Sequence, residues 1–164
     1  MKKINVVLYS PEIPQNTGNI SRTCAVTGAA LHIIKPIGFE ISDRTLKRAG
    51  LDYWDKLEVY YYESYADFLS RHKDATLYYF SSKGKHSFAE VDYTDDVWLV
   101  FGCESVGLPE GLVRENFQNT LRIPMRGDVR CLNLSNAVAV AVYEVLRQDS
   151  YDGFKIESNY DIKE

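Results

Sequence analysis

Short runs of β-branched and aromatic residues alternate along this chain with segments of helical character, and this alternation constrains the fold most strongly. Strands that are separated by helices pair mainly in parallel, and helices then cover both faces of the sheet. We therefore predict an α/β fold with a mainly parallel sheet. The predicted strands span residues 4–9, 31–35, 57–61, 76–80, 97–101 and 120–123.

Capping residues predict the helices between these strands. Residues 19–27 and 44–49 are each followed by a glycine, which suits the position just after a helix. Ser64 can cap a further helix that runs to about His72, with an acidic residue in its first turn.

Residues 133–148 allow two interpretations. The centre of the segment alternates alanine and valine with a period of two, as a buried strand does. We predict a helix instead, because Asn133 or Ser135 can cap it and the segment is too long for a typical strand. Its alanines leave a smooth face, which suits an interface between domains or between two copies of the chain.

The length of 164 residues is that of one domain, and 45% apolar residues supply ample material for a core. We predict a single domain over residues 1–148 and a loose polar tail over residues 149–164. The first apolar run is too short for a signal peptide, and none approaches the ~20 residues of a membrane span. A cytoplasmic location is therefore expected.

Cysteine usage supports the same location. Cys24, Cys103 and Cys131 are widely spaced, without a CxxC pair or a histidine-rich cluster, so neither disulfides nor a metal site are expected. We expect all three to be packing or loop residues, because free cysteine behaves mostly as a small hydrophobe.

The formal net charge of −4 argues at first sight against a nucleic-acid partner. Residues 149–164, however, carry five acidic and two basic residues, so the remainder is close to neutral. Solvated surface charge is the simpler interpretation of any one basic group, although convergent groups would form an electrostatic footprint. The basic groups are Arg44, Lys47 and Arg48; Lys83 and Lys85; and Arg122, Arg126 and Arg130.

Familiar catalytic signatures are absent from the sequence. It contains no GxGxxG, P-loop, HExxH or GxSxG motif. His32, His72 and His86 have no obvious serine or cysteine partner, and His32 lies in a predicted strand, where packing is the expected role. A hydrolase or a metalloenzyme therefore has little support.

The first of three notable loops spans residues 10–22 and follows the first predicted strand. Two prolines stiffen it, and Asn16-Thr-Gly-Asn19 leads into a helix. Backbone N–H groups at a helix start suit an anion, and Arg22 lies about one turn further on. A stiffened turn with a surface arginine is the simpler alternative.

Two further loops follow later strands, at the sheet edge where open α/β folds bind ligands. Residues 101–109 place Glu104 between two glycines, and glycine lets a ligand approach the backbone closely. Residues 123–136 lead from a strand through a glycine-bearing loop into the small-residue helix. Each loop alone is a weak signal, whereas their order and spacing together are specific.

In that order and spacing the loops resemble the SPOUT (SpoU-type, α/β-knot) superfamily of S-adenosylmethionine-dependent RNA methyltransferases. The resemblance covers nearly all of residues 4–148. Its motifs are Asn16-Thr-Gly-Asn with Arg22, Phe101-Gly-x-Glu-x-x-Gly-Leu-Pro109, and Ile123-Pro-Met followed by Asn133-Leu-Ser-Asn-Ala-Val138.

Within the superfamily, segments 8–14, 32–34, 48–53 and 142–144 are most similar to the minimal tRNA 2′-O-methyltransferases of the wobble nucleotide, cytidine or uridine 34. This resemblance implies the anticodon loop of tRNA as substrate. It also implies a deep trefoil knot formed by the C-terminal segment. The resemblance implies a homodimer as well, in which the partner chain completes each site.

The resemblance further implies that S-adenosylmethionine binds between the three loops, largely through backbone groups. The matching positions are Phe80, Gly102, Ile123, Cys131 and Leu132. Cys103 and Cys131 depart from the family pattern, in which proline and serine are usual at these positions. Backbone contacts survive both changes, but Cys131 offers no hydroxyl group.

The implied reaction moves a methyl group from a sulfonium to a ribose 2′-oxygen, which requires neither a metal nor a covalent enzyme intermediate. In the family, the arginine that matches Arg22 is proposed to be the base. A guanidinium with a pKa above about 12 is almost never neutral at pH 7. We therefore assign Arg22 to holding a phosphate and stabilising the developing alkoxide.

Other residues are candidates for shaping the pocket and placing the ribose. These are Asn16, Glu104, Asn133 and Ser135, and Glu104 is also a candidate proton acceptor. Tyr143 is expected to contact either the substrate or the partner helix. Structural support of the knot is the alternative role for each of them.

Three alternative functions remain open from the sequence. The same fold can act on another tRNA position or on ribosomal RNA. A knotted protein can bind RNA without catalysis. A flavodoxin-like nucleotide binder without a knot is the third alternative, but it leaves residues 133–136 unexplained. How an acidic chain binds RNA is a further question, and we hypothesise that a dimer aligns residues 44–48 with Lys83 and Lys85.

Overall fold

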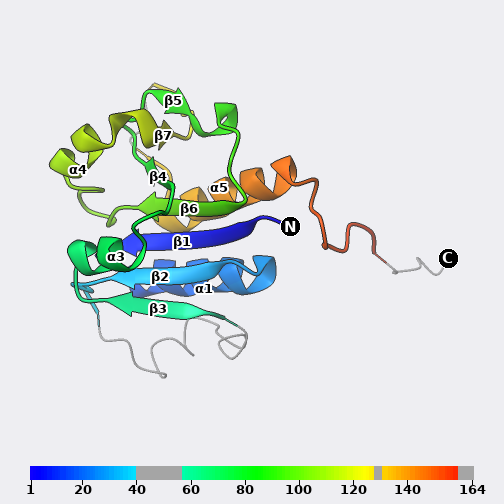
Figure 1. The fold of residues 1–164 in the computed structure, drawn as a ribbon, viewed down its shortest axis with the longest axis horizontal. Coiled ribbons are helices and arrows are strands. Elements are labelled where there is room, and N and C mark those ends of the chain that lie inside the picture. Colours follow the sequence, from blue (N-terminus) through cyan, green and yellow to red (C-terminus); the bar gives the residue numbers. More distant parts are fainter. Residues whose placement is uncertain (40–56, 128–130, 159–164) are drawn as a thin grey trace.

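The computed structural model describes residues 1–39, 57–127 and 131–158. Within them, seven strands form one sheet in the order β3-β2-β1-β6-β4-β7-β5, and every paired strand is parallel to its neighbour (Figure 1). The predicted parallel α/β sheet is thus confirmed. The strands are β1 Lys3–Tyr9, β2 Ala30–Ile34, β3 Val59–Tyr62, β4 Leu77–Phe80, β5 His86–Ser87, β6 Asp96–Phe101 and β7 Thr120–Arg122.

Helices lie on both faces of this sheet. Helices α1 and α5 pack against each other on one face, behind the strands in Figure 1, and α3 and α4 pack on the other face. Their bounds are α1 Pro14–Thr27, α3 Tyr65–Arg71, α4 Glu110–Glu115 and α5 Leu134–Gln148, with short 3-10 helices at Phe88–Glu90 and Phe117–Asn119.

The central strands are buried from both sides. In β1, Val6 packs toward α1 and α5 and Val7 packs toward α3 and α4, and neither side chain is exposed to solvent. Alternate residues of β6 divide in the same way, with Leu99 on the first face and Val100 on the second. This double burial explains why the strands read as continuous apolar runs instead of alternating with polar residues.

Helix boundaries confirm some of the capping predictions and correct one. Ser64 accepts a hydrogen bond from the backbone N of Asp67 and caps α3. Asn133 caps α5, which is a helix and not a strand. Helix α1 ends before Gly28, as predicted, but it begins at Pro14 and not at residue 19. Proline suits the first helical turn because its missing N–H is not needed there.

Strand β5, helix α4 and the short 3-10 helices were not predicted. Strand β5 has two residues, and α4 has six residues without a side-chain cap, so neither leaves a clear periodic signal. The helix predicted at residues 44–49 lies outside the described residues. Among the residues that the structure describes, none of the helices is long and apolar enough to cross a membrane.

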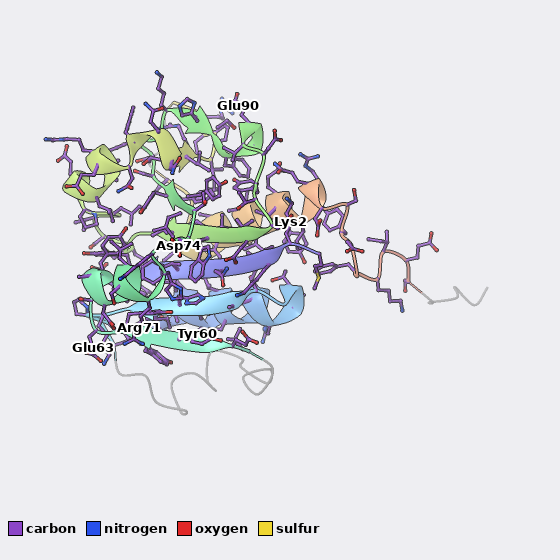
Figure 2. The ribbon with its side chains drawn as sticks, in the orientation of Figure 1. Lys2, Tyr60, Glu63, Arg71, Asp74 and Glu90 are labelled. Carbon is purple, nitrogen blue, oxygen red and sulfur yellow. The ribbon has the colours of Figure 1, made fainter. Side chains whose placement is uncertain are left out.

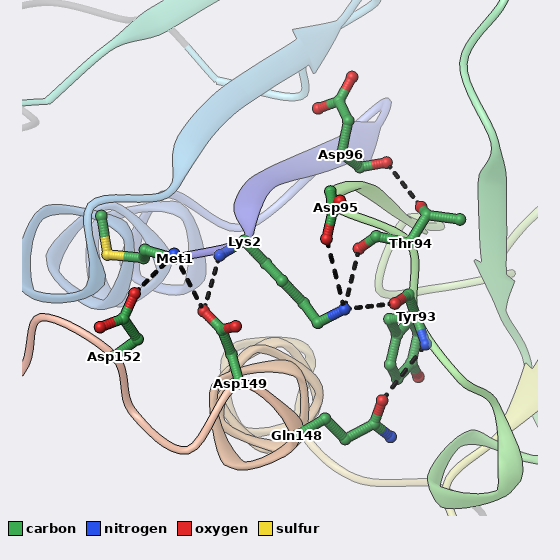
Figure 3. Close-up of polar contacts among 9 residues, drawn as sticks. All are labelled: Met1, Lys2, Tyr93, Thr94, Asp95, Asp96, Gln148, Asp149 and Asp152. Atoms are coloured by element: carbon green, nitrogen blue, oxygen red, sulfur yellow. Dashed lines mark hydrogen bonds and ion pairs between the residues drawn. The ribbon is translucent and has the colours of Figure 1, made fainter.

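The residues just after α5 are held against the N-terminus (Figure 3). The Met1 ammonium group donates to Asp152 at 2.7 Å, and the backbone N of Lys2 donates to Asp149 at 2.7 Å. Tyr151 and Phe154 pack against the core beneath α5. The prediction of a loose tail from residue 149 onward is therefore wrong for residues 149–154.

A chain of polar side chains runs beneath α3, from the exposed Asp96 through the buried Asn5, His32 and Tyr62 to the half-buried His72. Asn5 donates through Nδ2 to Asp96, so its Oδ1 faces His32 Nε2 at 3.3 Å, and Nε2 must be the donor. His32 Nδ1 then accepts from the Tyr62 hydroxyl at 2.8 Å, and Tyr62 in turn accepts from His72 Nε2 at 2.8 Å. We call these five residues the histidine chain.

The surroundings of His32 confirm its predicted packing role. Its ring stacks on Tyr60 with centroids 4.9 Å apart and lies 4.7 Å from the ring of Trp98. Burial, reinforced by the nearby His72, lowers the pKa of His32 to about 3. Arg71, which lies near Tyr60 at the same edge of the sheet (Figure 2), is 5.3 Å from the centroid of the Tyr62 ring and adds a cation–π contact to this cluster.

Candidate functional site

A cavity of about 550 Å³ opens at the carboxyl edge of the sheet. Because all the strands are parallel, the segments after β4, β6 and β7 leave the sheet at this one edge, where open α/β folds bind ligands. These segments line the cavity together with the start of α1 and the residues that lead into α5. The three loops singled out in the sequence therefore meet around one space.

The loop after β6 folds back on itself, and this explains its glycines. The backbone N of Gly107 donates to the carbonyl of Cys103 at 3.0 Å, and Gly107 has a φ of 73°. A Cβ atom on Gly102 would lie 2.1 Å from the carbonyl carbon of Gly107. Gly102 is thus required by the close approach of its own loop, whereas the sequence suggested the approach of a ligand.

Glu104 joins this loop to the loop after β1. Its carboxylate accepts hydrogen bonds from the backbone N of Glu12 at 2.8 Å and of Ile13 at 3.2 Å, and from Asn16 Nδ2 at 3.0 Å. In return, the Glu12 carboxylate accepts from the backbone N of Ser105 at 2.9 Å and from its hydroxyl at 2.7 Å. These bonds from Ser105 lower the pKa of Glu12.

Asn133 joins the third loop to the same network. Because Asn16 Nδ2 faces a carboxylate, its Oδ1 must accept from Asn133 Nδ2, at 3.0 Å. Asn133 Oδ1 then accepts from the backbone N of Ser135 at 2.9 Å and from the Ser135 hydroxyl at 2.7 Å. Four predicted pocket residues thus form one hydrogen-bonded chain, which we call the loop network: Glu104, Asn16, Asn133 and Ser135.

The apolar part of the cavity comes from strand ends. The rings of Phe80 and Phe101 stack with centroids 4.7 Å apart, at the ends of neighbouring strands β4 and β6. All five residues predicted to contact the cofactor line the cavity, namely Phe80, Gly102, Ile123, Cys131 and Leu132.

Three predicted site residues do not line this cavity, namely Ser135, Arg22 and Tyr143. Ser135 is buried at the start of α5 and is linked to the cavity wall through Asn133. Arg22 lies on the exposed face of α1, and Tyr143 is 45% exposed on α5. Because α1 and α5 pack side by side on one face of the sheet, their exposed residues form one surface, which we call the helix face. Its members are Gln15, Asn19, Arg22 and Val26 of α1, and Asn136, Val140, Tyr143 and Arg147 of α5.

Two of the basic groups converge beside the cavity. Strand β5 pairs with β7, with His86 opposite Leu121, so Lys83 and Lys85 lie next to Arg122. Arg122 donates to the carbonyl of Ser82, and Lys83 also lines the cavity. The groups at residues 44–48 and at Arg130 lie outside the described residues.

Sequence reasoning missed Glu12 and Ser105. Their mutual hydrogen bonds connect residues 93 positions apart, and neither residue type carries a local signal for such a partner. Among the described residues, no group of three or more histidine, cysteine or acidic side chains is arranged to hold a metal ion.

The fold and the cavity together define a class of protein. It is an open parallel α/β protein with a ligand-sized cavity built from loops at the carboxyl edge of its sheet. Comparison with known families narrows the class, because residues 3–143 match the SpoU rRNA Methylase family. The chain belongs to that family.

Individual relatives agree with this assignment. The tRNA (cytidine(34)-2′-O)-methyltransferase of Escherichia coli (strain K12) is 46% identical over 151 residues, which cover 92% of this chain and 96% of that protein. A solved structure that concerns 2-OH methylation of C/U34 on tRNA superposes with a TM-score of 0.86 at 46% identity, covering 92% of this chain and 98% of that one.

A more distant structure carries a cofactor. The SpoU methyltransferase AviRb from Streptomyces viridochromogenes, in complex with AdoMet, superposes with a TM-score of 0.79 at 25% identity. The similarity covers 91% of this chain and 58% of AviRb.

Proposed function

We propose that this protein transfers a methyl group from S-adenosylmethionine to the ribose 2′-oxygen of nucleotide 34, cytidine or uridine, in tRNA. One observation carries the proposal: the three loops that match the family motifs enclose a single cavity at the carboxyl edge of the sheet. The reaction and substrate of the relatives that match along nearly their whole length support this choice. A cytoplasmic location follows from this substrate.

The cavity fits the proposed cofactor in size and chemistry. Its volume of about 550 Å³ falls within the roughly 300–1,000 Å³ range of small-molecule sites. The stacked rings of Phe80 and Phe101 offer an apolar surface for a base, and the loop backbones beside Gly102 and Leu132 offer donors and acceptors for its edge. The bound cofactor would supply the electrophilic methyl group.

We assign the loop network to positioning. The Glu104 carboxylate oxygens already accept three hydrogen bonds within the chain, which favours a role in fixing the loops over the role of proton acceptor. Asn16 and Asn133 transmit this restraint to the start of α5. Such restraint matters because methyl transfer depends on alignment of the two reacting atoms.

We assign Arg22 to binding the tRNA substrate. A guanidinium on the helix face can hold a backbone phosphate and stabilise the alkoxide that develops on the ribose. Because Arg22 does not line the cavity of its own chain, we propose that the site is completed in a homodimer.

The helix face is the proposed dimer interface. Val26, Val140 and Tyr143 are 58%, 40% and 45% exposed there. The fully buried core of an interface is more apolar than the rest of a protein surface, and tyrosine is enriched in it. Packing a second copy on this surface would bury all three. It would also bring the Arg22 of one chain toward the partner's cavity.

The deep trefoil knot also belongs to this proposal. Strand β7 lies between β4 and β5, whereas α5 packs against α1 and contacts β1 and β6. The chain therefore passes from β7 across the carboxyl edge to reach α5, and we propose that it threads beneath the loop after β6. Lys83 lines the cavity, Lys85 and Arg122 lie beside it, and all three are proposed to contact the tRNA backbone.

Methylation of total tRNA with labelled S-adenosylmethionine, followed by nucleoside mapping, tests the proposal. We expect label in 2′-O-methylcytidine or 2′-O-methyluridine at position 34. Label at another tRNA position, or in ribosomal RNA alone, would move the enzyme to a different substrate. Binding of tRNA without transfer of label would favour a non-catalytic RNA-binding protein.

A further inference from the structure

The three cysteines occupy two contrasting environments. Cys24 lies in the core beneath α1, is fully buried, and has its thiol pKa raised by burial to about 12. Cys103 and Cys131 both line the cavity at the carboxyl edge. They come from different loops, one directly after β6 and the other shortly before α5.

The two cavity thiols differ in accessibility. Cys103 is half-buried, and its Sγ is held within its turn, 3.5 Å from the carbonyl oxygen of Gly107 and 3.8 Å from the Ser105 hydroxyl. Cys131 is exposed and lies next to Leu132 and Asn133, which also line the cavity. An external reagent therefore meets Cys131 first.

We infer that the cavity is a thiol modification site, at which low-molecular-weight disulfides compete with the methyl donor. The thiolate of Cys131 attacks one sulfur of the disulfide, the original S–S bond breaks, and a new one forms to the protein. The leaving thiolate takes up the proton that Cys131 loses. No other oxidant is required, and a reducing thiol reverses the exchange.

The consequence for the cavity is steric. An adduct on Cys131 extends from a residue that lines a space of about 550 Å³, and thereby removes volume and backbone contacts that a ligand needs. A bound ligand conversely shields the thiol. Modification at Cys103 has the same consequence but proceeds more slowly, whereas Cys24 stays unmodified in the folded protein.

This inference rests on the proposed function, because it takes the cavity to be the S-adenosylmethionine site. The test begins with calorimetric titration of the reduced protein with S-adenosylmethionine. The protein is then treated with oxidised glutathione, and each adduct is located by peptide mass mapping before the titration is repeated. Circular dichroism confirms that the modified protein remains folded.

We expect the first adduct at Cys131, a loss of affinity of at least about tenfold, recovery after reduction, and slower modification when the ligand is present. For Cys131→Ser, the affinity after treatment should equal the affinity of the same variant before treatment, apart from the effect of slow modification at Cys103. The control Cys24→Ser should respond like the wild type. Undiminished affinity with Cys131 fully modified, or equal modification rates with and without ligand, would overturn this inference alone. A reduced protein that binds no S-adenosylmethionine would instead overturn the proposed function.

Discussion

Two polar networks lie in different parts of the structure, and they differ in what surrounds them. The histidine chain runs between strands beneath α3 and contains the residue types most often found in active sites. The loop network contains no histidine, yet it ties three loops together around a cavity. The contrast teaches that access to a cavity, and not the chemical reactivity of the side chains, separates a site from a structural support.

The largest expected effect comes from Arg22, which belongs to neither network and is assigned to the substrate. Arg22→Ala should reduce methyl transfer to tRNA by about 100- to 1,000-fold, because it removes the group assigned to the phosphate and the developing alkoxide. Cofactor affinity should change by less than about twofold, since the cavity is untouched. Transfer kinetics beside calorimetric titration measure both quantities. The exposed Arg114→Ala serves as control, and an equal loss of binding and transfer would refute the role.

Substitution within the loop network should have the next largest effect on methyl transfer. Glu104→Ala removes the acceptor of three hydrogen bonds, so the loops after β1 and β6 lose their common anchor. We expect a loss of about 100-fold in kcat/KM for methyl transfer, the size associated with misalignment by about 1 Å. Glu63→Ala, at the β3 edge (Figure 2), is the matched control. Activity within about twofold of wild type would show that the loops do not depend on Glu104.

Breaking the histidine chain should act on stability and not on the reaction. His32→Ala leaves a cavity and deprives Asn5 and Tyr62 of their partner, which should lower the free energy of unfolding by about 2–4 kcal/mol. Methyl transfer per folded molecule should stay within about twofold of wild type. Chemical denaturation and transfer assays on the same preparation measure the two quantities, with His86→Ala as control. A selective loss of activity would place His32 in the mechanism.

The histidine chain also predicts an acid-dependent loss of stability. Burial lowers the pKa of His32 from its ordinary 6.5 to about 3 and also lowers the pKa of His72. Between these values the unfolded chain binds more protons than the folded one, so stability is full above about pH 6.5 and falls as the pH decreases. The expected slope is up to about 1.4 kcal/mol per pH unit for each histidine.

Denaturant titrations between pH 4.5 and 7 measure that slope. Carboxylates such as Glu12, whose pKa is lowered from 4.5, contribute mainly below this range. The slope should shrink in His32→Ala and persist in His86→Ala. A flat profile in the wild type would contradict the assignment of a buried, neutral His32.

The sequence was informative where a signal is local. Alternation of strands and helices predicted the parallel sheet, and the caps Ser64 and Asn133 predicted the starts of α3 and α5. The prolines led to a wrong prediction of where α1 begins. They were interpreted as part of a stiffened loop before the helix, whereas Pro14 is the first residue of the helix. Proline is compatible with both structures, so its presence alone does not decide between them.

No sequence signal marked hydrogen bonds between residues that are far apart in the chain. Glu12 and Ser105 meet across 93 positions, and Lys2 meets Asp149 across 147. Hydrogen bonds of this kind depend on the completed sheet, which brings the loops after β1 and β6 to one edge. The family motifs include Asn16, Glu104 and Asn133, but they do not indicate that these residues form hydrogen bonds with one another.

The central claim, that the cavity at the carboxyl edge binds S-adenosylmethionine, is tested most directly by titration of a matched pair of variants. Leu132 and Leu69 are similarly exposed, at 40% and 37%. Leu132 lines this cavity, whereas Leu69 lies on α3 and does not line it. Calorimetry of Leu132→Asp should show affinity reduced by at least about tenfold, with Leu69→Asp unchanged. Equal affinities in both variants, or a greater loss in Leu69→Asp, would contradict the account.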